Sequence, residues 1–233
     1  MIRVSGGREW IRLSTVAIVV FAMLLAAAPA AMAGDAEDAQ GTVDKALITF
    51  KGMHGDKDFK WMNEHLQKAK GVLIYPQVLK AGFVLGGSGG TGVLLRRDEK
   101  TGNWSNPGFY TMGAVSFGLQ IGGESAEVIL LVMTQKGMDS LLTSKFKLGG
   151  DVSIAAGPVG GGAKSDITAD FISFAKSKGL YAGLNLEGSY LDVRSSLNNA
   201  YYGKETTPAD IMIKQSVENP ASFPLRDALK KAK

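Results

Sequence analysis

Cysteine is absent from this chain of 233 residues. Without a thiol the protein forms no disulfide, thiolate zinc site or iron–sulfur cluster, and it has no cysteine nucleophile or lipidated N-terminal cysteine. Histidine is nearly as scarce, because only His54 and His65 occur. Their spacing of eleven does not match the i, i+4 spacing with which two histidines share a helix face in metal sites. We therefore expect no metal and no cofactor, and the composition argues against most enzyme classes.

An excess of one charge is also lacking. The 26 basic and 22 acidic side chains leave a net charge of +4, and half of that excess lies in the first 33 residues, which contain three arginines and one glutamate. The remaining net charge of +2 is too small for a general nucleic-acid-binding protein, so we expect no nucleic-acid partner. The 30 glycines follow no three-residue repeat, and 45% of the residues are hydrophobic, which indicates a globular chain.

The first 33 residues have the pattern of a secretory signal peptide. Three arginines precede an unbroken apolar run at 16–28, Pro29 then interrupts any helix, and Ala31-Met32-Ala33 offers small residues at the two key positions of a cleavage site. We expect cleavage after Ala33, export to the periplasm and a mature chain of residues 34–233 that forms a single domain. The alternative is an uncleaved membrane anchor, since no charge occurs between Arg12 and Asp35.

Two amphipathic helices are predicted at the start of the mature chain. Apolar residues recur with helical spacing from 43 to 53 and again from 59 to 69, and Gly55-Asp56 separates the two stretches. We interpret both as helices that pack on a β core. The alternative is that they lie on a membrane surface. The apolar positions are Val43, Ala46, Leu47, Phe50 and Met53 in the first helix and Phe59, Met62, Leu66 and Ala69 in the second.

A glycine-rich β region and a helical C-terminus follow. The period of the pattern changes to two, and strands are predicted at 71–75, 81–86, 91–97, 115–121, 128–133, 146–156, 167–175 and 180–191, with a short helix at 135–144. Helices are predicted at 207–217 and 224–231. Because helices do not alternate with the strands, we predict an α+β, β-rich fold: an antiparallel sheet that forms a sandwich or barrel, flanked by N-terminal and C-terminal helices.

The glycine clusters resemble catalytic motifs only in part. Gly86 to Gly90 encloses Ser88 in a G-x-S-x-G pattern, but a strand-like stretch follows it and both histidines lie upstream. The cluster at 157–165 approaches a P-loop, but Lys164 is displaced by one residue. We interpret the first cluster as a β-turn, expect no nucleotide binding at the second, and predict no catalytic residue. Six carboxylates could form a hydrolytic pair across strands but are interpreted as solvated: Glu124, Glu127, Asp151, Asp170, Glu187 and Asp192.

Two predicted strands have one face of small or polar residues. Such a face lines a cavity, or it relieves crowding in a tightly curved sheet, and the sequence leaves both interpretations open. The positions are Ala114, Ser116, Gly118 and Gln120 on one strand and Gly183, Asn185, Glu187 and Ser189 on the other.

Lysines occur at the predicted edges of the sheet. Each alone is typical of a solvated turn, but together they could contact anionic lipid head groups, at about 1 kcal/mol per lysine. The candidate lipid-binding residues are Lys68, Lys70, Lys80, Lys176 and Lys178.

Seven short blocks, in order, resemble the SYLF domain family over roughly residues 69–203. They include Ala69-Lys-Gly-Val-Leu-Ile-Tyr-Pro76, Trp104-Ser-Asn-Pro107, Leu148-Gly-Gly-Asp151 and the run from Ser177 to Gly188. The resemblance implies a compact, β-rich, lipid-binding domain. Eukaryotic members bind phosphoinositide-containing membranes and some bind actin, whereas bacterial members are typically exported. For an exported chain we expect neither actin nor phosphoinositides as partners.

The helix at 42–53 also resembles the amphipathic N-terminal segment that family members use at membranes, although Asp44, Lys45 and Lys51 do not make its polar side strongly basic. We expect an exported, non-enzymatic protein that binds lipid or anionic membrane surfaces in the cell envelope. One alternative is a structural protein that recognises an envelope protein through its β-sheet. A third is a hydrolase that uses Ser88 or a carboxylate pair.

Overall fold

The structure is a computed structural model that describes residues 34–143, 145–158, 160, 168–177, 180–181 and 186–232. The predicted signal peptide therefore lies outside the described residues, as do Lys178 and most of the 157–165 glycine cluster.

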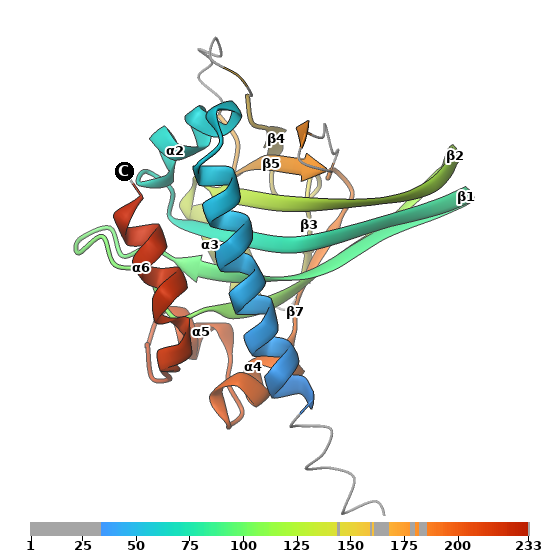
Figure 1. Cartoon of the computed structure of the whole chain (residues 1–233). Helices are drawn as coiled ribbons and strands as arrows, with labels where there is room; N and C mark the ends of the chain where they lie inside the picture. The colour runs from blue at the N-terminus through green and yellow to red at the C-terminus, as the bar shows by residue number, and fades with distance from the viewer. Residues whose placement is uncertain are drawn as a thin grey trace, which may run out of the picture.

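A single sheet organises the described part of the chain (Figure 1). Two long strands, β1 (Gly71–Arg96) and β2 (Gly108–Val132), pair along their whole length. The sheet order is β3-β7-β2-β5-β4, with β6 on β5, and every pairing is antiparallel except the parallel β4–β5 pair. The short strands are β3 (Lys145–Lys147), β4 (Ile154–Ala156), β5 (Phe171–Ser177), β6 (Leu180–Tyr181) and β7 (Tyr190–Val193). The predicted β-rich, mainly antiparallel α+β fold is confirmed.

Strand β1 folds back on itself, so its two halves lie side by side. The amide of Arg97 donates to the carbonyl of Lys70 (2.8 Å) at the open end of this fold-back. Further in, a Cβ on Gly90 would lie 2.3 Å from the carbonyl oxygen of Gln77, and one on Gly92 would lie 2.4 Å from that of Ile74. Only glycine permits such close backbone contact. The chain is continuous strand across 86–90, which corrects the prediction that this cluster is a turn between two strands.

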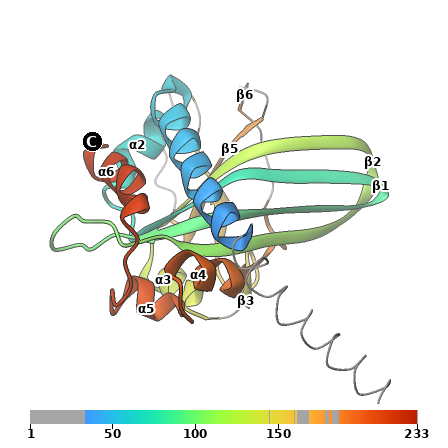
Figure 2. The same ribbon diagram turned by 60° about the horizontal axis from the view of Figure 1, so that its bottom comes forward.

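Strand β2 follows the same bend around β1. Val72 lies opposite Leu131 near one end of β2, and Leu94 lies opposite Gly108 at its other end. The register shifts between Tyr75 and Val78, where Pro76 lacks the amide needed for regular pairing. Both views show the bends in the middle of β1 and β2 projecting together beyond the helices (Figures 1 and 2).

The curled sheet separates two hydrophobic cores. On the inner face of the curled sheet, the rings of Phe146 on β3 and Phe171 on β5 stack with their centroids 5.9 Å apart. Two strands that are distant in the sheet order therefore come into contact. Helix α3 (Gln135–Leu141) and helix α5 (Pro208–Met212) also bury side chains in this enclosed core. Thr207 and Asp210 form a capping box at the start of α5, where the sequence predicts a helix N-terminus.

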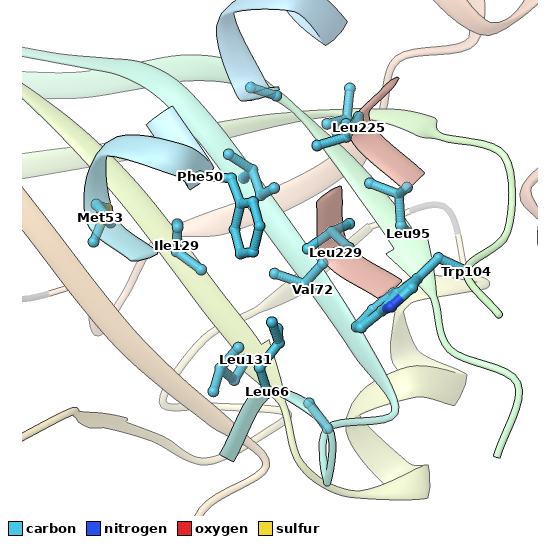
Figure 3. Close-up of a cluster of buried hydrophobic side chains, with 14 of the residues drawn as sticks. Phe50, Met53, Leu66, Val72, Leu95, Trp104, Ile129, Leu131, Leu225 and Leu229 are labelled. Carbon is cyan, nitrogen blue, oxygen red and sulfur yellow. The ribbon is translucent and has the colours of Figure 1, made fainter. Parts of the chain in front are cut away.

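Helices cover the outer face of the sheet and form the second core. A long N-terminal helix (34–54) crosses the strands, and α2 (Lys60–Leu66), α4 (Ser195–Tyr202) and α6 (Phe223–Lys231) pack beside it (Figure 2). Short 3-10 turns precede α2 and α6, at Lys57–Phe59 and Pro220–Ser222. Figure 3 shows side chains from these separate segments converging, among them Phe50, Leu66, Val72, Ile129 and Leu229. Helix α4 was not predicted. Within the described residues no helix is both long and apolar enough to cross a bilayer.

Candidate functional site

The structure divides the candidate lysines between two parts of the sheet. Lys68 and Lys70 immediately precede β1, whereas Lys80 lies ten residues beyond Lys70, up to about 33 Å along the strand. Lys176 lies on β5, beside the half of β2 that also pairs with Lys80. The structure therefore brings Lys80 and Lys176 to one region and Lys68 and Lys70 to another. Their role in lipid binding stays a prediction, and Lys178 lies outside the described residues.

Two of these lysines are held by carboxylates of the protein. Lys70 forms an ion pair with Glu99, and the Nζ of Lys176 lies 2.7 Å from the Oδ2 of Asp56. The hydrogen bond from Lys176, assisted by the amide of Asp58, lowers the pKa of Asp56. The side chain of Lys176 is only 17% exposed. These two lysines consequently stabilise contacts within the fold, whereas Lys68 is exposed to solvent.

The apolar faces of both N-terminal helices are buried against the sheet. Val43, Ala46, Phe50 and Met53 are at most 2% exposed, and the predicted face of the second helix is buried in the same core. The only large exposed hydrophobic side chain on the described first helix is Ile48. Packing on the β core, rather than lying on a membrane surface, is therefore the arrangement in this structure.

A partly buried hydrogen bond joins the first helix to the sheet. The Oγ1 of Thr49 donates to the Oε1 of Glu127 on β2 at 2.6 Å. Glu127 lies directly opposite Lys176 in the β2–β5 register, and Lys176 in turn binds Asp56 in the turn after the helix. One region of the sheet thus contacts both the first helix, through Thr49, and the turn that follows it, through Asp56.

Ser88 lies within strand β1, opposite Ala114 on β2. A nucleophile elbow requires the serine at a sharp turn from a strand into a helix, and this position is instead continuous strand. This geometry argues against one form of the third hypothesis, the hydrolase in which Ser88 is the nucleophile.

Both histidines take part in packing around the second helix. The imidazole of His65 stacks on the indole of Trp61 with centroids 3.6 Å apart and an interplanar angle of 6°. The ring of His54 stacks on Phe50 at 5.5 Å, and its Nδ1 lies 2.8 Å from the Oδ1 of Asn63. These contacts assign the histidines to the junction between the first helix and α2.

The most enclosed carboxylate among the six candidates is Asp170. It is 8% exposed and accepts hydrogen bonds from the Ser153 amide (2.9 Å) and hydroxyl (2.8 Å) and from the Thr134 hydroxyl. Burial alone would raise the pKa of Asp170, but these hydrogen bonds outweigh it and lower the pKa. Thr134 also caps α3, so Asp170 connects that helix to the sheet. Among the described residues no group of three metal-ligating side chains gathers.

Exposed apolar side chains lie near the projecting bend of β1 and β2, where the sequence did not indicate a binding site. Leu79 is 54% exposed and Val115 is 73% exposed. The small-residue face that contains Ala114 lies in this region, although the side chains at 116–122 are not described. Neither interpretation of that face is tested. Glu187 and Ser189 of the second small face are described, whereas Gly183 and Asn185 are not.

Comparison with known proteins matches residues 113–232, just over half the chain, to the Ysc84 family model, which is described as "Las17-binding protein actin regulator". This region begins near the start of β2 and runs through α6. It therefore includes most of β2, the later short strands and the C-terminal helices.

Several curated eukaryotic proteins are similar to this chain. SH3 domain-containing protein PJ696.02 of Schizosaccharomyces pombe is 35% identical over 167 residues, which are 69% of this chain and 38% of that protein. LAS seventeen-binding protein 3 of Saccharomyces cerevisiae is 36% identical over 169 residues, or 69% of this chain and 36% of that protein. SH3 domain-containing YSC84-like protein 1 of Bos taurus is 30% identical over 152 residues, or 63% and 44%. The aligned region spans less than half of each of these relatives. The family-model match and these identities show that this chain belongs to the Ysc84 (SYLF domain) family.

Proposed function

We propose that this chain is a non-enzymatic protein that binds lipid or anionic membrane surfaces in the cell envelope after export. The observation that carries the proposal is its membership of the Ysc84 (SYLF) family, for which the resemblance implies lipid binding. The exposed lysine at the start of β1, Lys68, supplies positive charge at the surface. Such charge favours an anionic head group over a neutral one.

The positions of the potential catalytic residues support a non-enzymatic role. Ser88 lies in continuous strand, and His54 and His65 are engaged with aromatic rings in the helical layer. Asp170 accepts hydrogen bonds that connect β5, the segment before β4 and helix α3. These side chains make structural contacts within the fold and do not lie together at one site.

The proposed location rests on the pattern of residues 1–33, with its basic start, its apolar run and its Ala-Met-Ala end. The family model is described by actin regulation. Because we propose export, we do not extend that role to this chain.

A second candidate function is recognition of an envelope protein through the sheet. The description of the family model and the name of one relative state binding to Las17 or LAS seventeen. Leu79 and Val115 expose apolar surface on neighbouring strands of this chain. Exposed apolar surface of this kind is typical of sites that bind a partner.

Co-sedimentation with vesicles tests the proposal. The chain is expressed from residue 1, purified as the cell processes it, and its N-terminus is determined by mass spectrometry. Binding to vesicles that contain phosphatidylserine, and weaker binding to phosphatidylcholine vesicles, is the expected result. Absence of binding to either vesicle, with recovery of one crosslinked envelope protein, would favour the second candidate function.

A further inference from the structure

Three segments meet at the end of the molecule opposite the projecting strands. Gln67, at the end of α2, donates through its Nε2 to the carbonyl oxygens of Leu229 (3.1 Å) and Ala232 (2.6 Å) near the C-terminus. Its Oε1 accepts a hydrogen bond from the Nε of Arg97 (3.2 Å), at the start of the loop between β1 and β2. Both views show this loop, α2 and the end of α6 on one side of the molecule (Figures 1 and 2).

Basic side chains are concentrated around this junction, which we call the basic end. Six basic and three acidic residues lie within the ranges 67–70, 97–103 and 227–232. This excess of three positive charges exceeds the net charge of +2 expected for the whole mature chain. The basic residues are Lys68, Lys70, Arg97, Lys100, Lys230 and Lys231, and the acidic residues are Asp98, Glu99 and Asp227.

All three acidic side chains are engaged within the protein. Glu99 pairs with Lys70, and Asp227 lies 2.8 Å from the Nζ of Lys231. Asp98 accepts hydrogen bonds from the amides of Lys100 and Thr101 (both 2.9 Å), which lower its pKa and keep it ionised.

Three lysines remain exposed at the basic end. Lys68, Lys100 and Lys230 are solvent-exposed, and none of them forms an ion pair with a carboxylate of the described residues. They come from the turn after α2, the loop and α6, so their relative positions depend on the junction at Gln67.

We propose that the basic end is the surface by which this protein docks on an anionic phospholipid bilayer. The proposal rests on the proposed function and places the contact on residues that include Lys100 and Lys230. The lysines extend outward from three separate segments rather than converging on one pocket. Dispersed, hydrated ammonium groups suit a plane of many head groups better than a single bound phosphate.

The consequence for orientation is specific. With the basic end on the bilayer, the projecting bends of β1 and β2 point away from the membrane (Figure 1). The exposed Leu79 and Val115 then remain accessible to other molecules while the protein is bound.

Two charge-reversal variants of the full chain test the proposal. The first carries Lys68→Glu, Lys100→Glu and Lys230→Glu, and the matched control carries Lys51→Glu, Lys145→Glu and Lys204→Glu at other exposed positions. Both change the net charge equally, and circular dichroism verifies that both fold. Partitioning onto phosphatidylserine vesicles is measured at low salt, with the Lys→Arg triple variant of the basic end as a rescue.

We expect the basic-end variant to lose at least about a hundredfold in partitioning, since each lysine near an anionic surface contributes about fivefold and each replacement also adds a repelled negative charge. The control should lose less than about threefold, because its lysines lie outside the basic end and the intervening solvent weakens their interaction with the bilayer. Equal losses in both variants, or a loss confined to the control, would overturn the proposed surface while leaving membrane binding intact. Stronger binding of the basic end to duplex DNA than to vesicles would also overturn it. If the native chain binds no anionic vesicle, the proposed function itself fails.

Discussion

The ammonium group of Lys176 on β5 lies 2.7 Å from the carboxylate of Asp56, in the turn between the first helix and α2. Asp56 also caps the helical turn that follows, where it accepts a hydrogen bond from the amide of Asp58. A residue that first suggests lipid contact thus has a second role, in positioning the helical layer on the sheet.

This ion pair predicts a dependence of stability on pH. Because Lys176 lowers the folded-state pKa of Asp56, the pair stabilises the fold above the unfolded pKa of the carboxyl group and ceases to do so as the pH falls through the folded pKa. We expect Asp56→Asn to lower the thermal unfolding midpoint at pH 7. In acid, the midpoint of the variant should approach that of the native protein. Thermal denaturation of both proteins from pH 7 down to about pH 2 measures this convergence. A constant difference at every pH would contradict it.

The buried face of the first helix predicts a large effect of one truncation. Phe50 is 1% exposed, whereas Ile48, two residues earlier on the same helix, is 68% exposed. Phe50→Ala should lower the free energy of unfolding by about 3–4 kcal/mol through loss of buried surface and creation of a cavity. Ile48→Ala, the matched control, should change it by less than about 0.5 kcal/mol. Urea denaturation provides both values, and equal small effects would show that the helix does not dock as described.

The fold-back of β1 predicts that two glycines differ in their tolerance of a side chain. A Cβ at Gly92 would lie 2.4 Å from the carbonyl oxygen of Ile74, whereas the nearest atom to a Cβ at Gly113 is 4.0 Å away. Gly92→Ala should therefore destabilise the protein by about 2 kcal/mol or more. Gly113→Ala should be within about 1 kcal/mol of neutral. Chemical denaturation compares the two, and a tolerated Gly92→Ala would contradict the close approach of the two halves.

Two buried tyrosines should respond to hydroxyl removal in opposite directions. The hydroxyl of Tyr110 donates to the carbonyl of Leu141, whereas that of Tyr75 is buried without a partner among the described residues. Burial raises the pKa of both phenols, so both stay neutral. Tyr75→Phe should stabilise the fold by about 1 kcal/mol and Tyr110→Phe should destabilise it by a similar amount. Destabilisation by both substitutions, measured in urea, would indicate that Tyr75 has a partner.

The sequence predicted the elements whose patterns are local. The helical spacing of Val43, Phe50 and Met53 indicated the buried face of the first helix, and Thr207-Pro208-Ala209-Asp210 located the start of α5. Helix α4 was missed because its sequence, SSLNNAYY, has low helix propensity, with serine or asparagine at four of its eight positions. Its packing comes from tertiary contacts instead, since Leu197 and Tyr201 join the helix-covered core.

The fold-back of β1 could not be predicted from the alternation of apolar and polar residues along the chain. The glycines at 86–90 are typical of a turn, yet they lie within a strand that requires them for close backbone approach. No local pattern could predict which candidate lysines are paired within the fold, because the ion pair of Lys176 with Asp56 joins residues 120 positions apart. The same holds for Gln67, whose contacts with Leu229 and Ala232 bring the chain end beside Lys68.

Salt-dependent co-sedimentation of the native chain with phosphatidylserine vesicles tests the central claim most directly. The account predicts binding at low ionic strength that weakens steadily as salt is added, because the exposed lysines act through screened charge. Binding that salt leaves unchanged would contradict this account and indicate apolar insertion instead. Absence of binding at low salt would contradict membrane-surface binding altogether.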